Sequence, residues 1–450
     1  MKKIYQLSVV LTLLSVLPGC EKFLDARADK TATVPSTLQD AQALLDNITI
    51  VNGSWMWITH LYSDELFVPN SGYNSATLES ARLNYMWNDG ADNGPQWMAS
   101  FRRINVANTA LAVLENVVVT PQNSKIYSDV RGQALFLRAL SNYKLAQIFC
   151  PVYSITSKDE RYGLPLILTE SIAEPYVRVS LAETYAHIIN DLSNAATLLP
   201  PLPAFKTRAS KAAAYGQLAK LYLQIADYSK AEYAAKLALQ IQPELMDYNQ
   251  FNPAAAIPFQ RFNKEVIYHS TSSTGISNTN SRVDTMLYAA YHNDDLRKQL
   301  FFQRQAEGYY NFKGNYDGQL TGNLFDGLST GELYLVLAES RVYTGQTSDA
   351  LIALNTLLLN RWKAGRFVPV AEMDKDLLLE RIRQERRFEL VYRGCRWADI
   401  RRYNRDGFAR AGLKRILNGV IYELPLGDPR FTALVPWQVI EMGGVFQNPR

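Results

Sequence analysis

Apolar residues recur at helical spacing through most of the chain beyond residue 96. This periodicity predicts one amphipathic helix over residues 97–119 and another over residues 128–149. Ser180 and Glu183 have the spacing of a capping box, which marks the start of the next predicted helix. The remaining predicted helices cover residues 180–199, 211–225, 229–241, 331–344, 347–361 and 376–393. The chain is therefore predicted to be mainly α-helical.

The helical pair over residues 212–243 carries the signature of a tetratricopeptide unit, a helical hairpin of 34 residues. Small residues are expected where the two helices approach each other closely, and large residues where the groove between them is filled. The residues at the signature positions are Tyr215, Leu218, Ala219, Tyr222, Ala231, Ala235, Ala238 and Pro243. A second, weaker unit begins at Gly331, and the helices over residues 128–149 and 180–199 are a candidate third unit.

Two long segments outside these hairpins lack a sustained period. Residues 50–96 and 250–330 are rich in Asn, Gly, Ser, Thr and Tyr, and we expect long loops with short strands there. Loops of this length are usually functional or disordered, and the aromatic content argues against disorder. We therefore predict a hairpin scaffold over about residues 97–245 and 331–404, with a loop-rich region that carries the ligand face.

The first twenty residues have the pattern of an export signal. Lys2 and Lys3 precede an apolar run that ends at Leu17, and this run is too short to span a bilayer as a helix. The following Leu17-Pro18-Gly19-Cys20 resembles the lipobox of bacterial lipoproteins, in which the cysteine is lipidated and becomes the new N-terminus. The alternative is an ordinary secreted protein with a cysteine at the cleavage boundary. We expect a signal peptide over residues 1–19 and a single domain over residues 20–450.

Composition and charge exclude several classes of protein. The 450 residues are 47% hydrophobic and 20% charged, which is the composition of a globular protein. A formal net charge of +4 gives no concentrated basic surface for nucleic acid. Three cysteines are too few for a disulfide scaffold, and the sequence does not show whether Cys150 and Cys395 form a pair.

Seven motifs, in order along the chain, resemble the SusD/RagB family of surface lipoproteins. The motifs are the lipobox followed by Phe23-Leu24-Asp25, then Ser63-Asp64-Glu65, the helix from Trp97 to Asn108, the helix from Arg131 to Phe149, the segment Tyr162-Gly163-Leu164-Pro165-Leu166, the helix from Glu332 to Glu339, and the segment from Ile382 to Asn404. Cys395, in the turn before Trp397, and the tail from Val435 to Arg450 depart from the family pattern.

The resemblance implies a function in nutrient uptake. Proteins of this family capture a nutrient at the outer membrane for a TonB-dependent transporter, here a SusC-like partner. A glycan ligand is the first expectation, and a peptide ligand fits the same fold. We expect no enzyme activity, no cofactor and no metal, and a surface glycan hydrolase is the second alternative.

Tryptophan is concentrated where the ligand face is expected. Four of the seven tryptophans lie between residues 55 and 97, and aromatic faces beside polar groups are suited to binding sugars. Trp97 lies on a helical apolar stripe and is assigned to the core. For Trp55, Trp57 and Trp87, both core packing and ligand contact remain open. The family resemblance adds five candidate ligand residues in this region and before the last hairpin, namely Tyr73, Asn88, Tyr309, Tyr310 and Tyr316.

Three other features have simpler explanations than a second function. The eight arginines between Arg381 and Arg402 are expected to form structural ion pairs, such as Glu385 with Arg381 and Glu389 with Arg393. Enzyme motifs of hydrolases and nucleotide-binding proteins are missing, although a carboxylate pair for glycan hydrolysis is formed in space and stays an alternative. The oxygen-rich group of Asp89, Asp92 and Asn93 is explained by turns rather than by a calcium site.

Overall fold

The computed structural model describes residues 34–171 and 176–450, and residues Thr37–Arg450 form one compact unit. The predicted signal peptide and the predicted lipidation site Cys20 lie outside the described residues. Within that part the chain contains 17 α-helices and ten short strands, so the expectation of a mainly α fold is confirmed.

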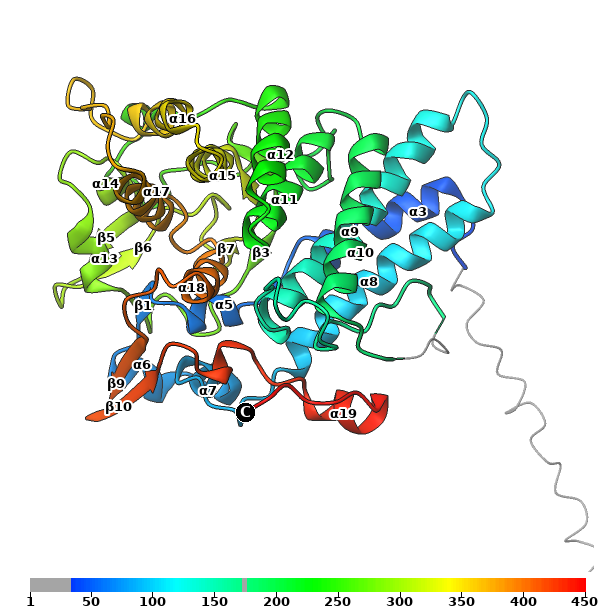
Figure 1. Ribbon diagram of the computed structural model, residues 1–450, viewed down its shortest axis with the longest axis horizontal. Helices are drawn as coiled ribbons and strands as arrows, with labels where there is room; N and C mark the ends of the chain where they lie inside the picture. The colour runs from blue at the N-terminus through cyan, green and yellow to red at the C-terminus, as the bar shows by residue number, and fades with distance from the viewer. Residues whose placement is uncertain (1–33, 172–175) are drawn as a thin grey trace, which may run out of the picture. The chain divides into compact units, whose positions relative to one another are not determined.

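Long helices packed side by side make up the scaffold (Figure 1). Each of the pairs α8 with α9, α9 with α10, α11 with α12, and α15 with α16 is in contact, and α12 also packs against α15. The bounds of these helices and of the neighbouring α17 are α8 (Gly94–Glu115), α9 (Ser124–Phe149), α10 (Leu181–Leu198), α11 (Lys211–Gln224), α12 (Tyr228–Ile241), α15 (Thr330–Tyr343), α16 (Thr347–Leu359) and α17 (Lys375–Glu389). Every helix predicted from periodicity is therefore present.

Small residues bring the scaffold helices together as the repeat signature predicts. Ala219, Ala231, Ala235 and Ala238 are completely buried between α11 and α12 and their neighbours. A Cβ atom at Gly216 would lie only 2.4 Å from a methyl carbon of Leu328, so α11 is in close contact with the segment before α15. Ser180 accepts a hydrogen bond from the backbone of Glu183, and the Glu183 carboxylate accepts one from the backbone of Ser180, which confirms the capping box of α10.

The loop-rich part consists of short elements that pair across long sequence distances. Antiparallel pairing of β1 with β4 joins the two predicted loop segments, with Leu66 opposite Val283. The other two-stranded sheets of the described residues pair β2 with β8, β3 with β7, β5 with β6, and β9 with β10. The strands of the loop-rich part are β1 (Leu66–Phe67), β2 (Val266–Tyr268), β3 (Thr271–Ser272), β4 (Arg282–Val283), β5 (Phe302–Arg304), β6 (Tyr310–Phe312), β7 (Leu324–Phe325) and β8 (Leu328–Ser329).

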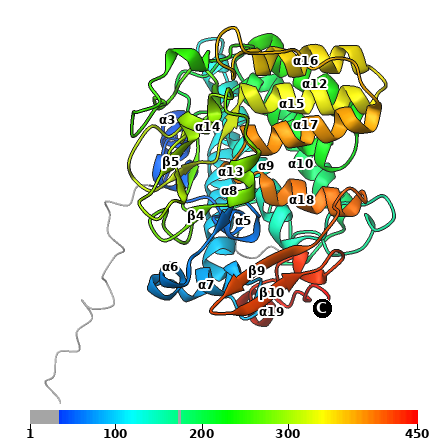
Figure 2. The same ribbon diagram turned by 90° about the vertical axis from the view of Figure 1, so that its left-hand side faces the viewer.

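The remaining elements are short helices and a C-terminal hairpin. The hairpin consists of β9 (Leu413–Leu417) and β10 (Val420–Leu424). The helices are α3 (Leu38–Leu45), α4 (Ile48–Val51), α5 (Ile58–Tyr62), α6 (Asn70–Ser75), α7 (Glu79–Tyr85), α13 (Thr285–Ala290), α14 (Arg297–Phe301), α18 (Arg396–Arg405), α19 (Trp437–Gly443) and the 3-10 turns η1 (Tyr248–Gln250) and η2 (Pro429–Phe431). Figure 2 shows β5, α13, α14, β9 and β10 on the side of the compact unit that faces the viewer.

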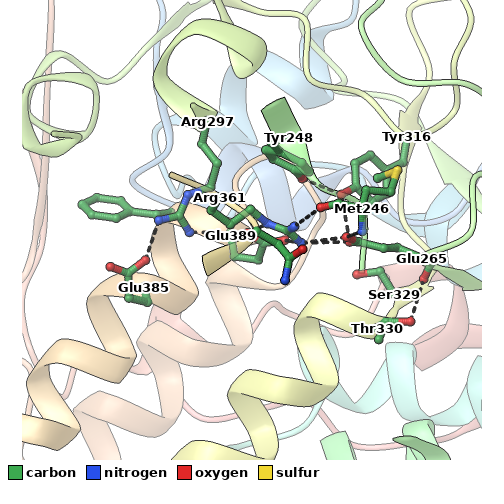
Figure 3. A network of polar contacts seen from close by, with 12 residues as sticks. Met246, Tyr248, Glu265, Arg297, Tyr316, Ser329, Thr330, Arg361, Glu385 and Glu389 are labelled. Atoms are coloured by element: carbon green, nitrogen blue, oxygen red, sulfur yellow. Dashed lines mark hydrogen bonds and ion pairs between the residues drawn. The ribbon is translucent and has the colours of Figure 1, made fainter. Parts of the chain in front are cut away.

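A buried network of charges connects the loop-rich part to α17 (Figure 3). The guanidinium of Arg361 contacts both carboxylate oxygens of Glu389 at 2.9 Å and the carboxylate of Glu265 at 2.9 Å. Arg297 binds Glu385 at 2.6 Å and contacts Glu389 at 3.4 Å. All five side chains are at most 1% exposed, so each charge is compensated inside the protein.

The arginine-rich segment is thus a set of internal ion pairs. Glu385 pairs with Arg381 at 2.6 Å, as predicted from their spacing. Glu389 was expected to pair with Arg393, and the structure corrects this, because Glu389 binds Arg361 instead. The reason is that α17 ends at Glu389 and Tyr392 has a positive φ of 59°, so the helical geometry needed for the Glu389–Arg393 pair is lost.

Candidate functional site

Three of the predicted ligand residues are buried. Trp55 is 0% exposed and lies beneath the guanidinium of Arg103, whose central carbon is 4.1 Å from the ring centroid. Trp87 is 2% exposed, and its indole N–H donates a hydrogen bond of 3.1 Å to the backbone oxygen of Tyr62. Tyr316 is 1% exposed and donates to the carboxylate of Glu265 at 3.0 Å. An arginine side chain covers the ring of each of these residues, although Trp87 also contributes to the lining of a hollow described below.

Three further candidates are accessible only in part or serve a local turn. Trp57 is half-buried and packs against both hydrophobic cores of the protein. Tyr73 on α6 is half-buried, with its hydroxyl 3.5 Å from the sulfur of Met86. Asn88 is exposed, and its side-chain oxygen accepts a hydrogen bond of 2.8 Å from the backbone of Gly90. Asn88 therefore stabilises its own turn.

The two remaining candidates are consecutive residues at the start of β6, in the loop-rich part of the protein. Tyr309 is 42% exposed, and its ring centroid is 5.1 Å from that of Phe67 in an edge-to-face arrangement. Tyr310 stacks on Tyr288 with a centroid separation of 3.6 Å. We call these four residues, Phe67, Tyr288, Tyr309 and Tyr310, the aromatic platform. Sequence reasoning missed Phe67 and Tyr288, because only the pairing of β1 with β4 and of β5 with β6 brings them beside the predicted tyrosines.

Polar groups beside the aromatic platform have unused hydrogen-bonding capacity. The amide nitrogen of Asn311 donates to the backbone oxygen of Asn278 at 2.9 Å, and the amide nitrogen of Asn278 donates to the backbone oxygen of Phe312 at 2.8 Å. The side-chain oxygens of both asparagines are buried and have no donor among the described residues. Burial, followed by the contact with Tyr310, raises the pKa of Tyr288 above its ordinary value, so this phenol stays neutral at physiological pH. The two asparagines therefore join the loop at residue 278 to β6, and the groups that the platform offers to a ligand are its rings and phenol hydroxyls.

A hollow adjoins the aromatic platform, because Phe67 belongs to both. Its lining includes Asp64, Asp284 and Lys414. Burial alone would raise the pKa of Asp64, but the guanidinium groups of Arg396 and Arg387 hold it well below its usual range. Asp64 is therefore ionised, and the guanidinium of Arg396 donates hydrogen bonds of 2.6 and 2.8 Å to its two carboxylate oxygens.

The group of Asp89, Asp92 and Asn93 has protein partners. Asp89 pairs with Arg450 at 2.8 Å, and Asp92 accepts a hydrogen bond from the backbone of Gly94 at 2.9 Å. The side-chain oxygen of Asn93 accepts a bond from Asn84. Within residues 34–171 and 176–450, no group of three or more His, Cys, Asp or Glu side chains is arranged to hold a metal ion.

Two further properties of the described chain bear on its setting. Cys150 and Cys395 are buried free thiols, which answers the question that the sequence left open. None of the helices in the described ranges is both long enough and apolar enough to cross a membrane.

Comparison with known proteins gives matches along most of the chain. A family model described as starch-binding associating with outer membrane matches residues 22–223, and the model of the SusD family matches residues 261–428. A search of curated proteins gives no match.

Solved structures share the fold at low sequence identity. A SusD superfamily protein from Bacteroides thetaiotaomicron is 19% identical, with a TM-score of 0.74 over 92% of this chain and 100% of that chain. A SusD superfamily protein from Bacteroides fragilis is also 19% identical, with a TM-score of 0.74 over 92% and 99% of the two chains. A laminarin binding SusD-like protein is 18% identical, with a TM-score of 0.64 over 91% and 97%. The same fold therefore extends through nearly the whole of the chain.

Proposed function

The chain belongs to the SusD/RagB family, and from this premise we propose that it binds an oligosaccharide or polysaccharide nutrient and delivers it to a SusC-like TonB-dependent transporter. The ligand is bound on the aromatic platform. A SusD-like protein of the same fold binds laminarin, which supports a carbohydrate as the class of ligand. Capture of this kind needs no catalysis, since it raises the ligand concentration at the mouth of the partner.

The observation that carries the proposal is the surface made by Tyr309 and its neighbours. The rings of Phe67 and Tyr309 lie edge to face, and Tyr288 stacks on Tyr310. Ring faces contact the C–H surface of a sugar, while phenol hydroxyls bind its hydroxyl groups. A peptide would use the same surface through its backbone and is the alternative ligand.

The proposed setting follows from the N-terminal sequence. We propose that residues 1–19 are removed, that Cys20 carries the lipid, and that residues 20–450 form one domain anchored at the outer membrane and facing the exterior. Co-purification of a transporter with the full-length lipoprotein from membranes is the measurement that checks the partner.

Replacement of Tyr309 by alanine tests the ligand face. We expect Tyr309→Ala to weaken oligosaccharide binding by about 1 kcal/mol, because the variant loses the exposed ring that we propose to contact the sugar. Binding is measured by titration calorimetry on residues 21–450, which include the whole compact unit, against neutral oligosaccharides and peptides. Tyr233→Ala is the control, since Tyr233 is a 66% exposed ring on α12 of the scaffold.

Two results would count against the proposed site or its proposed ligand. Equal affinities of the wild type and Tyr309→Ala for every saccharide that binds would contradict the proposed site. Binding of peptides without binding of saccharides would instead assign the surface to the alternative ligand.

A further inference from the structure

Arg304, the last residue of β5, is a charged side chain beside the aromatic platform. In the antiparallel pairing of β5 with β6, Arg304 is directly opposite Tyr310. Side chains paired in this way project from the same face of a sheet, with Cβ atoms about 5 Å apart. The preceding pair on this face is Phe302 with Phe312, and both of these rings are buried. Arg304 therefore lies where the buried part of the face ends and the exposed part begins.

Two observations place the guanidinium of Arg304 near both tyrosine groups of the platform. A Cβ atom at Gly308, in the turn that carries Tyr309, would lie 3.8 Å from Nη2 of Arg304. The charge of Arg304 also acts on Tyr288, because burial and the contact with Tyr310 raise the pKa of this phenol while the guanidinium opposes the rise. The guanidinium thus lies against the turn that displays Tyr309 and within electrostatic range of the stacked Tyr288 and Tyr310.

The guanidinium of Arg304 is not used by the fold. The side chain is exposed, and it has no hydrogen-bond acceptor or ion-pair partner among the described residues. The acidic residue of the same turn, Glu307, pairs with Arg282 at 3.5 Å. Arg282 also donates to the backbone oxygens of Thr279 and Ser281, at 2.8 and 2.9 Å. Of these two neighbouring arginines, one is therefore bound by the protein and the other is free to bind a ligand.

A free guanidinium beside aromatic rings recognises a particular arrangement of oxygen atoms. Its N–H groups lie in one plane and donate in pairs, so they match two acceptor oxygens that lie close together. A saccharide unit offers such pairs as vicinal hydroxyl groups, and a uronate unit also offers one as its carboxylate. Ring faces hold the apolar surface of a ligand, whereas a few directed polar groups fix its orientation. Arg304 can supply that direction.

We propose that Arg304 is a ligand residue beside the aromatic platform and donates two hydrogen bonds to a pair of adjacent oxygen atoms on the bound saccharide. This inference rests on the proposed function and makes it specific, since it names the residue that orients the sugar and the oxygen pattern that it recognises. Tyr309 and Tyr310 contact the C–H surface of the ligand, while Arg304 selects sugar units whose oxygens are close enough to share one guanidinium.

Three saccharide series of equal length test this inference on residues 21–450, namely cello-oligosaccharides, oligogalacturonides and the methyl esters of oligogalacturonides. All three carry vicinal hydroxyl groups, and only the free acid carries a carboxylate. We expect Arg304→Gln to weaken binding of at least one series about tenfold, as measured by titration calorimetry. A loss for all three series assigns the bound pair to hydroxyl groups. A loss for the acid alone, which diminishes as salt rises, assigns the pair to the carboxylate.

Two variants separate paired hydrogen bonding from charge. Arg304→Lys keeps the charge and loses the planar fork, so it should bind about threefold more weakly than the wild type. Arg102→Gln, at an exposed position of α8 in the scaffold, removes the same charge elsewhere and should bind as the wild type does. Urea denaturation of Arg304→Gln should give the midpoint of the wild type, because the exposed side chain has no partner in the fold.

The inference would be overturned if Arg304→Gln or Arg304→Lys had the affinity of the wild type for every saccharide that binds. If Tyr309→Ala weakens binding of the same saccharides while Arg304→Gln does not, the inference fails and the proposed function stands. If no saccharide binds the wild type, both fail.

Discussion

Glu65 shows how one buried carboxyl group links stability to pH. It is 2% exposed, and one of its oxygens accepts a hydrogen bond of 3.1 Å from the backbone of Tyr392. Burial, and then the negative charge of Asp64, raises the pKa of Glu65 to about 8. The folded protein therefore holds a proton on Glu65 at neutral pH, whereas the unfolded chain releases it at a pH near 4.5.

This difference predicts that Glu65 reduces stability as the pH rises. Between the unfolded pKa and a pH of about 8, the folded state binds more protons than the unfolded state, so the free energy of unfolding falls with rising pH. Glu65→Gln keeps the acceptor and removes the titration. We expect the variant to gain stability relative to the wild type between pH 5 and pH 8, as measured by urea denaturation. Glu115→Gln, at an exposed position of α8, should show no such gain, and a constant difference for Glu65→Gln would contradict the prediction.

Individual aromatic residues in the loops differ in ways that local sequence does not encode. Trp87 lies in a stretch that contains Asn88 and Gly90, and Tyr309 directly follows Gly308. Yet Trp87 is 2% exposed and Tyr309 is 42% exposed. Trp87 is covered by Arg415, whose guanidinium carbon lies 4.5 Å from its ring and which is 328 residues away in sequence. Contacts over such distances decide which ring faces the solvent, and the local sequence does not encode them.

At the scale of the elements, a glycine allows α6 to pack closely against the segment before β4. Gly72 in α6 is buried, and a Cβ atom at this position would lie 2.0 Å from the backbone oxygen of Asn280. Because backbone is the obstacle, α6 or the segment before β4 would have to move.

We expect Gly72→Ala to destabilise the protein by about 1–3 kcal/mol, the usual cost of overpacking a close contact. Chemical denaturation measures the change. Ser71→Ala, at an exposed position next to it in α6, is the control and should stay within about 0.5 kcal/mol of the wild type. A stable Gly72→Ala variant would show that α6 is free to shift.

Long helices were predictable, whereas the short paired strands were not. The periodicity of α8 to α12 and α15 to α17 extends over 13 or more residues, which is enough to identify a helix. The strands β1 and β4 have two residues each and are defined only by pairing across more than 200 positions. The hairpin of β9 and β10 is an exception, since Asn418 and Gly419 at its turn form the strongest short hairpin signal and were overlooked.

At the scale of the whole molecule, buried ion pairs hold the loop-rich part to the helical scaffold. Glu389 on α17 contacts Arg361 and Arg297, and Arg361 continues to Glu265 before β2 (Figure 3). A network that is fully buried gives little net stability when complete, but losing one partner leaves a charge without compensation.

We therefore expect Glu389→Gln to lower the free energy of unfolding by about 3 kcal/mol or more. Denaturation followed by circular dichroism and by tryptophan fluorescence measures the loss, and both probes should report one transition. Arg410→Gln is the matched control, because Arg410 and Glu380 form an ion pair in which the side chains are 84% and 60% exposed. A loss below about 1 kcal/mol for Glu389→Gln would mean that water or relaxation compensates the charge.

The turn between β5 and β6 is stabilised in part by its own backbone hydrogen bonds. Its backbone closes on itself, with the N–H of Gln305 bonded to the oxygen of Tyr309 and the N–H of Gly308 bonded to the oxygen of Gln305. It displays Tyr309 yet takes no part in the buried ion pairs shown in Figure 3. Glu307 and Tyr309 link the turn to the neighbouring strands, through an ion pair of 3.5 Å with Arg282 and the edge-to-face contact with Phe67. Exchange of residues 305–309 would therefore change the surface that we propose for ligand binding while leaving the buried ion pairs of the body in place.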